Sequence, residues 1–264
     1  MNIHEYISVK KNEKPLDRMV TDGGFCSIFR RLVCIGDSLS SGAFESMNQS
    51  GEKNYHDFYE YSWGQFIARN CGCQVYNFSM SGMTAKTYIE EFADKRGFWG
   101  KNMLAQAYII ALGVNDLICQ NQVLGSAQDV DKENYKANKK TFAGYYASII
   151  QKIKELQPRA KIFLVSMPKG GDKNDGIRKQ ARDLLDDFTH LFEDTYLIDL
   201  YTYAPMNNAE YEKFFFLGRH LAPTGYVFTA RMIESYIDYL IRKNPEDFKQ
   251  VGFIDTDLYY CQEE

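Results

Sequence analysis

Short apolar runs recur along the chain, and longer amphipathic stretches lie between and after them. The runs are brief and largely apolar, as is typical of buried strands; they span residues 31–37, 74–79, 107–113, 161–167 and 195–200. The stretches have the hydrophobic spacing of helices that bury one face; they span residues 61–70, 138–157, 176–194 and 223–243. In the last stretch, one face gathers Val227, Ala230, Ile233, Ile237 and Leu240.

Strands that alternate with helices predict an α/β fold, in which helices cover both faces of a parallel sheet and the crossovers are right-handed. The pattern fills residues 31–243, which we assign to one domain. Residues 1–30 are an N-terminal extension and residues 244–264 a C-terminal tail, and either could pack on the domain or on a partner. In this fold class, sites form outside the carboxyl ends of the strands. Residues with a chemical role are therefore expected directly after the strand runs.

Four polar motifs stand at these positions. "GDSLSSG" follows the first strand and places Ser38 on a sharp turn into a helix, where its hydroxyl and its own N–H face the same space. "NFSMSGMT" follows the second strand, and Gly82 allows its backbone N–H to approach an oxyanion closely. "ALGVNDL" follows the third strand, and the Asn115 amide can donate to the same oxyanion. His220 follows the fifth strand, ahead of the last helix.

Each motif alone has a plainer explanation. Gly-Asp-Ser is common in turns and N-caps, so Asp37 is expected to support the turn at Ser38. Asp116 is expected to cap the turn that follows Asn115. A lone histidine is more often structural than catalytic. The order of the four motifs, each beyond a predicted strand, nevertheless favours a nucleophile, two oxyanion donors and a base.

These residues carry a family resemblance. Ser38, Gly82, Asn115 and His220 resemble the four signature residues of the SGNH/GDSL hydrolases. "GDSLS", "NFSMSG" and "GVND" match the first three blocks of that family, and "HLAPTGY" matches the segment after the histidine. The resemblance spans roughly residues 31–242. It implies a flavodoxin-like three-layer α/β/α sandwich with a central five-stranded parallel sheet. It also implies hydrolysis of esters or thioesters, often of acetyl groups on sugars or of lipid acyl chains.

The resemblance implies an acyl-enzyme mechanism on Ser38. His220 would remove the Ser38 proton as the oxygen attacks the acyl carbon. The N–H groups of Ser38 and Gly82 and the Asn115 side chain would hold the oxyanion, and each such donor is worth about 3 kcal/mol of barrier. His220 would then protonate the leaving alcohol, and water would release the acyl group. This chemistry requires no metal and no organic cofactor.

The histidine block departs from the family pattern. Most members carry an aspartate three residues before the histidine, where this chain has Leu217. A backbone carbonyl near Leu217 could accept the ring N–H instead. A carboxylate from elsewhere could also do so, and the candidates are Asp199, Glu210 and Glu212. We expect a working Ser–His dyad; the alternative is a site that binds without turnover.

Two further residues are candidates for substrate contact. Arg219 could bind an anionic or polyhydroxylated substrate, although an arginine beside a site more often lies in a surface ion pair. Trp63 could stack on a sugar ring, although packing is the commoner use of tryptophan. The preferred function is hydrolysis of a short-chain ester, an acetyl group on a carbohydrate. The alternatives are a lysophospholipase or thioesterase for longer acyl chains and a carbohydrate- or ester-binding protein with weak turnover.

Charge and hydropathy exclude several partners. The formal net charge of −4 gives no electrostatic case for nucleic acid or an anionic membrane. No stretch reaches the roughly 18 apolar residues of a membrane helix. The first 30 residues contain no apolar run of signal-peptide length, so a cytoplasmic location is expected. The expected partner is a small-molecule or oligosaccharide ester, and homo-oligomerisation through the extensions remains open.

Overall fold

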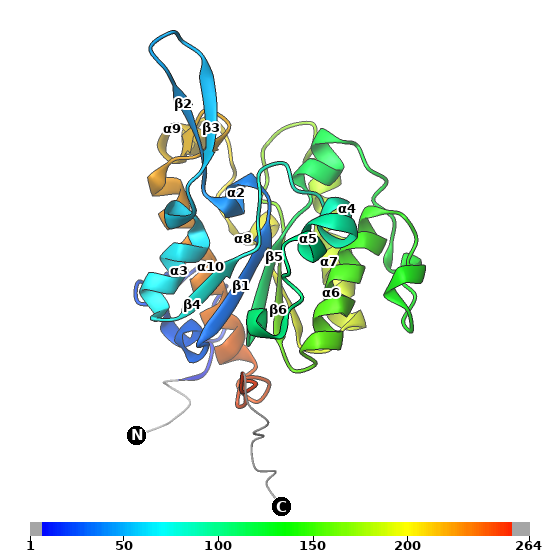
Figure 1. The fold of residues 1–264 in the computed structure, drawn as a ribbon. Coiled ribbons are helices and arrows are strands. Elements are labelled where there is room, and N and C mark those ends of the chain that lie inside the picture. The colour runs from blue at the N-terminus through cyan, green and yellow to red at the C-terminus, as the bar shows by residue number, and fades with distance from the viewer. Residues whose placement is uncertain (1–6, 255–264) are drawn as a thin grey trace, which may run out of the picture.

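A central sheet of five parallel strands organises the computed structural model, which describes residues 7–254 (Figure 1). The spatial order is β4 (Gln74–Asn77), β1 (Arg31–Gly36), β5 (Ala107–Ala111), β6 (Lys161–Val165) and β7 (Thr195–Ile198). In β1, Leu32 pairs with Val75 on one side and with Ala107 on the other. All five predicted strands are confirmed, and their order is that of a flavodoxin-like sheet.

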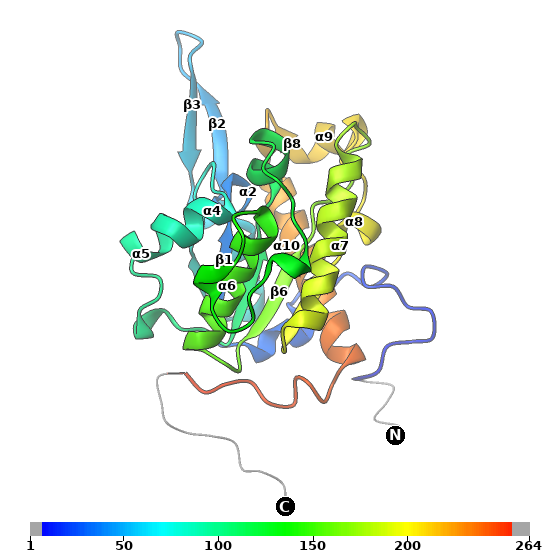
Figure 2. The same ribbon diagram turned by 90° about the vertical axis from the view of Figure 1, so that its right-hand side faces the viewer.

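Helices cover both faces of the sheet, which confirms the predicted three-layer sandwich (Figures 1 and 2). One face carries α3 (Trp63–Cys71) and α10 (Pro223–Lys243). The other face carries α4 (Ala85–Thr87), α5 (Ala93–Lys95), α6 (Phe142–Leu156) and α7 (Asp175–Leu191). Local signals set the ends of these helices. Ser62 caps α3 by accepting from the Gln65 N–H, and Pro223 stands in the first turn of α10.

Each strand supplies both layers because its side chains alternate between the two faces of the sheet. In β1, Val33 and Ile35 join the apolar cluster beneath α6 and α7. Leu32 and Cys34 join the cluster beneath α3 and α10. The sheet is therefore buried on both faces, and the carboxyl ends of its strands are where a site is expected in this fold class.

Short helices lie in the connections: η1 (Gly24–Ile28), α2 (Ser38–Ser41), η2 (Tyr59–Tyr61), η3 (Tyr88–Phe92), η4 (Lys101–Met103), η5 (Val114–Cys119), η6 (Ala127–Asp129), η7 (Tyr135–Ala137), α8 (Leu200–Tyr203) and α9 (Ala209–Phe215). Over residues 7–254, no helix combines the length and the apolar character needed to cross a membrane.

The chain between β1 and α3 forms a β-hairpin that the sequence analysis did not predict. β2 (Ala43–Met47) and β3 (Lys53–Asp57) pair in antiparallel fashion and project beyond the carboxyl end of the sheet (Figure 1). All of β3 is exposed, so this segment lacks the apolar run that indicates a buried strand. A second antiparallel pair, β8 (Phe216–Leu217) and β9 (His220–Leu221), leads into α10.

The described part of the N-terminal extension packs on α10. The N–H of Val20 donates to Ser235 Oγ at 2.9 Å, and that of Phe25 donates to Asp238 Oδ1 at 2.9 Å. The Arg242 guanidinium pairs with Glu13 at 2.6 Å. These contacts bury polar side chains of α10, so the helix is buried on more sides than the single apolar face predicted.

Candidate active site

The nucleophile motif forms the turn that was predicted for it. Ser38 is the first residue of α2, directly beyond β1, and Asp37 caps this helix by accepting from the Leu39 N–H at 3.0 Å. At the first helical position the Ser38 N–H has no acceptor within the helix, so it is available to a bound group. Asp37 is buried, and this burial raises the pKa of its carboxyl to about 6.

The loop after β4 runs alongside the nucleophile turn. The N–H of Met80 donates to the Gly36 carbonyl at 3.3 Å, which carries the loop past the end of β1. Gly82 has a φ of 77°, in the left-handed region that favours glycine. A side chain built at Gly82 would meet no atom within 4 Å, so the position faces open space. An acyl group can therefore approach this backbone closely.

Asn115 joins these two motifs. It lies in η5, and its Nδ2 donates to the Met83 carbonyl at 3.1 Å and to Asp37 Oδ2 at 3.4 Å. The amide thus links the turn at Ser38 to the loop that carries Gly82. The structure brings together three motifs that are separated by more than 30 residues in the sequence.

Asp116 has a different role from the one predicted. It does not cap its own turn; its Oδ1 accepts the Ala85 N–H at 2.8 Å and so holds the start of α4. Asp116 is fully buried, and burial raises the pKa of its carboxyl to about 7. The prediction was wrong because Asp116 lies buried within η5, where its carboxylate meets the backbone of Ala85 rather than that of its own turn. This contact ties the Asn115 loop to the segment that follows Gly82.

His220 begins β9, which lies against α2. Its Nδ1 is 3.3 Å from Glu45 Oε1, on the β2–β3 hairpin. Glu45 also accepts the Arg219 N–H at 2.6 Å and pairs with the Lys53 ammonium at 3.2 Å. The bond from the Arg219 N–H is the main reason why the pKa of Glu45 is lowered. Within residues 7–254, no hydrogen bond joins Ser38 Oγ to the His220 ring; in free enzymes such bonds are often long.

The partner of His220 corrects the sequence analysis. Asp199 is buried away from the ring, where it pairs with Arg182 at 2.9 Å and caps α8 through the Thr202 N–H. Glu210 and Glu212 are exposed on α9. The carboxylate beside the ring belongs to Glu45, seven residues after Ser38. Sequence reasoning missed Glu45 because it assigned no strand to the hairpin that carries this residue.

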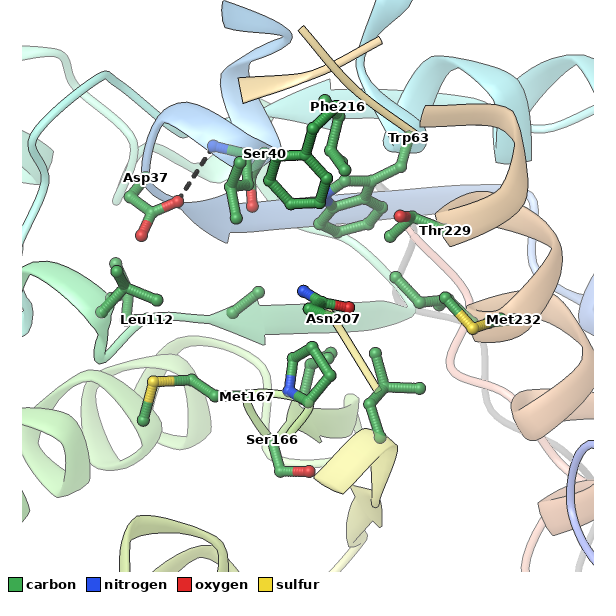
Figure 3. Close-up of a pocket in the computed structure, with 18 of the residues that line it drawn as sticks. Asp37, Ser40, Trp63, Leu112, Ser166, Met167, Asn207, Phe216, Thr229 and Met232 are labelled. Atoms are coloured by element: carbon green, nitrogen blue, oxygen red, sulfur yellow. Dashed lines mark hydrogen bonds between the residues drawn. The ribbon is translucent and has the colours of Figure 1, made fainter. Parts of the chain in front are cut away.

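An apolar cavity of about 100 Å³ lies next to the nucleophile turn (Figure 3). Its walls come from the carboxyl ends of β5 and β6, from α2 and from α10, and they include Asp37, Ser40, Leu112, Met167, Phe216 and Met232. Trp63 also lines this cavity and is only 2% exposed. Its ring packs the interior, so it does not offer an open face to a sugar.

Two exposed side chains flank His220 instead. Tyr55, on β3, is 57% exposed, and its ring lies edge-on to the His220 ring with centroids 6.0 Å apart. Arg219 is exposed, and its guanidinium forms no ion pair with any residue between 7 and 254. The Arg219 side chain is therefore available to a bound molecule, and Tyr55 is the aromatic residue of segment 54–63 that lies beside the His220 ring.

The sequence of this chain is similar to that of one known protein family. The profile of the GDSL-like Lipase/Acylhydrolase family matches residues 34–227, which is most of the chain. Among curated protein sequences, none matches significantly.

Solved structures share the fold at low sequence identity. A family two carbohydrate esterase from Clostridium thermocellum, in complex with cellohexaose, aligns with a TM-score of 0.58 and 15% identity over 80% of this chain. A carbohydrate esterase family 2 enzyme from Corynascus thermopiles aligns with a TM-score of 0.52 and 16% identity over 80% of this chain. The chain spans about two thirds of these two proteins, 64% and 66% respectively. TesA aligns with a TM-score of 0.51 and 17% identity over 80% of this chain and 97% of its own.

Proposed function

The chain belongs to the GDSL-like lipase/acylhydrolase family, and on this premise we propose that it is a serine esterase that removes a short acyl group, an acetyl, from a carbohydrate. One observation carries the proposal: Ser38, Gly82 and Asn115 lie at one end of the sheet, joined by the bonds of Asn115 to Asp37 and Met83. His220 reaches the same end through β9, which packs on the nucleophile helix. Binding alone would not require a hydroxyl, a free backbone N–H, an amide and an imidazole at the same end of the sheet.

The proposed reaction proceeds in two halves. His220 takes the Ser38 proton as Oγ bonds to the acyl carbon, and the carbonyl oxygen becomes an oxyanion. The N–H groups of Ser38 and Gly82 and the Asn115 amide stabilise that oxyanion, at about 3 kcal/mol for each donor. The imidazolium then gives its proton to the leaving alcohol, which departs and leaves the acyl group on Ser38. Water, deprotonated by His220, attacks this acyl-enzyme, and the acid leaves with Ser38 restored.

The leaving alcohol must lie beside His220, because this ring protonates it. Tyr55 presents an exposed aromatic face at that place, and aromatic faces suit the apolar side of a sugar ring. The likeness to a carbohydrate esterase solved with cellohexaose agrees with a carbohydrate substrate. Tyr55→Ala is therefore expected to raise KM for an acetylated oligosaccharide and to leave p-nitrophenyl acetate kinetics unchanged. Equal effects on both substrates would contradict a sugar contact at Tyr55.

A second candidate is an acylhydrolase for longer chains, and the apolar cavity supports it. The cavity lies against Asp37 and Ser40, beside the proposed acyl-enzyme, and its volume is about 100 Å³. A tail of several methylene groups would bury apolar surface there, worth about 0.8 kcal/mol for each CH₂. A rate that rises with acyl length would favour this candidate over the acetylesterase.

The direct test is hydrolysis of p-nitrophenyl acetate, butyrate and octanoate by the purified protein. Ser38→Ala and His220→Ala should each abolish turnover. Ser126→Ala and His190→Ala, which change the same residue types in other parts of the chain, should not affect it. The order of rates along the acyl series separates the two candidates. If the wild-type protein matched the uncatalysed rate on all three esters, the esterase proposal would fail and a binding role would replace it.

A further inference from the structure

The β2–β3 hairpin turns one face toward the active site. Its register pairs Ala43 with Asp57, Glu45 with Tyr55, and Met47 with Lys53. Residues paired across strands share a face, and every second residue along a strand returns to it. Asp57, Glu45 and Tyr55 therefore lie in a row on the same side of the hairpin, and all three have contacts in the site.

The base of the hairpin is joined to the nucleophile turn itself. Gly42 is the C-cap of α2, and its carbonyl accepts the Phe58 N–H at 2.9 Å. This hydrogen bond joins the two ends of the hairpin next to α2. Gly42 has a φ of 80°, and a side chain there would lie 2.2 Å from the Phe58 carbonyl oxygen. This close approach sets the position of the hairpin relative to Ser38.

Glu45 holds the histidine block. Its side chain is only 7% exposed, and its Oε1 accepts the Arg219 N–H while it faces His220 Nδ1. The turn between β8 and β9 is shaped around this carboxylate, because a side chain at Gly218 would lie 2.5–2.8 Å from its atoms. Leu217, at the place where related proteins carry aspartate, is 53% exposed. The hairpin thus places a carboxylate beside His220 Nδ1, the ring nitrogen to which the usual aspartate would bind.

Asp57 holds the other half of the site. Its Oδ1 accepts the Ser41 hydroxyl at 2.6 Å and the Ser81 hydroxyl at 2.7 Å. Ser41 belongs to α2, and Ser81 directly precedes Gly82. One carboxylate therefore links the nucleophile helix to the loop whose N–H is the proposed oxyanion donor.

We propose, on the basis of the esterase function above, that the β2–β3 hairpin positions both halves of the active site, through Glu45 on His220 and Asp57 on the Gly82 loop. Glu45 accepts the Nδ1–H of the ring, which leaves Nε2 as the proton acceptor for Ser38 and stabilises the imidazolium that forms. Neither side chain touches substrate, so both are positioning residues. The acid of a family-type triad is thus replaced by a residue from a separate element.

Glu45→Gln tests the first half of this proposal, with Glu52→Gln in the turn of the same hairpin as the matched control. A ring held in the wrong tautomer loses about 10⁴-fold in kcat, so Glu45→Gln should lower kcat at least about 100-fold with little change in KM. Adding Leu217→Asp, which restores the usual acid, should recover part of that loss. Proton NMR gives a readout independent of turnover: a downfield imidazole N–H resonance should be present in the wild type and in Glu52→Gln and absent in Glu45→Gln and His220→Ala.

The outcomes separate this proposal from the esterase function. If the wild type is active and Glu45→Gln keeps its kcat within twofold of the wild type, the role of Glu45 is refuted while the esterase stands. If the wild type is inactive on every ester, the function fails, and the NMR resonance still decides whether Glu45 holds the ring.

A double-mutant cycle tests the second half. Asp57→Asn and Ser81→Ala should each lower kcat about tenfold, and the double variant should be no worse than either single variant, since residues that share one contact do not act additively. Additive losses, or no loss in either variant, would overturn the role of Asp57.

Discussion

Asn115 is the residue on which the proposed oxyanion hole most depends. Its amide lies between Asp37 and Met83 and has no other described acceptor. One of its two N–H groups would therefore exchange its present acceptor for the oxyanion during the reaction. Asn115→Ala should therefore lower kcat by about 10²- to 10³-fold and change KM little, as for other single oxyanion donors. Steady-state kinetics beside Asn102→Ala, an exposed asparagine in η4, checks this. An equal loss in both variants would indicate a general structural effect instead.

Asp116 makes stability depend on pH. Its pKa is raised by burial from 3.8 to about 7, so the folded protein binds a proton there that the unfolded chain has released. Stability is greatest below the unfolded value and falls as the pH rises toward 7, because ionising the buried carboxyl is unfavourable. Asp116→Asn retains the acceptor for the Ala85 N–H and removes the charge. Urea unfolding from pH 4 to 8 should show a smaller loss of stability in Asp116→Asn, and parallel curves for the two proteins would contradict this.

Single residues were predicted where a local motif carried the signal. Ser38, Gly82, Asn115 and His220 each follow a strand, so the strand pattern alone indicated that they would meet at one end of the sheet. Glu45 and Asp116 were missed or misread because their partners lie far away in the sequence, at His220 and Ala85. Such contacts are tertiary, and no spacing rule reports them.

Among the helices and strands, too, some were predicted from the sequence and others were missed. The five strands of the sheet were found because burial on both faces requires apolar runs. The β2–β3 hairpin was missed because its strands are mostly exposed. Yet the hairpin carries the partner of His220, so the element with the weakest pattern holds an important part of the site.

The loop after β6 offers a test of the cavity. Met167 lines the cavity from this loop (Figure 3). Met167→Trp should fill the space and lower the ratio of octanoate to acetate turnover, because a longer acyl chain loses its apolar pocket while an acetyl group does not reach it. Rates on the three p-nitrophenyl esters give this ratio. An unchanged ratio, in a variant that keeps its acetate activity, would show that acyl chains do not enter this cavity.

At the scale of the whole molecule, the described part of the N-terminal extension (residues 7–30) and the candidate active site lie at opposite ends of the sheet (Figure 1). The extension buries Val20 and satisfies Ser235 and Arg242 on α10. Deleting residues 1–22 removes that burial and leaves polar groups of α10 to water. The free energy of unfolding should fall by about 2–4 kcal/mol, from the lost side chain and hydrogen bonds. Urea titration measures the loss, and kcat at low temperature should stay at the wild-type value; a truncated protein that keeps its full stability would contradict this account.

In the proposed mechanism Ser38 is a nucleophile activated by His220, and trapping the acyl-enzyme tests this most directly. The protein would be mixed with p-nitrophenyl acetate, quenched in acid within milliseconds, digested and examined by mass spectrometry. We predict an acetyl group on the peptide that contains Ser38, accumulating in the wild type and absent in Ser38→Ala and His220→Ala. Ester hydrolysis by the wild type without an acetyl group on Ser38, or with the group on another residue, would contradict the proposed mechanism.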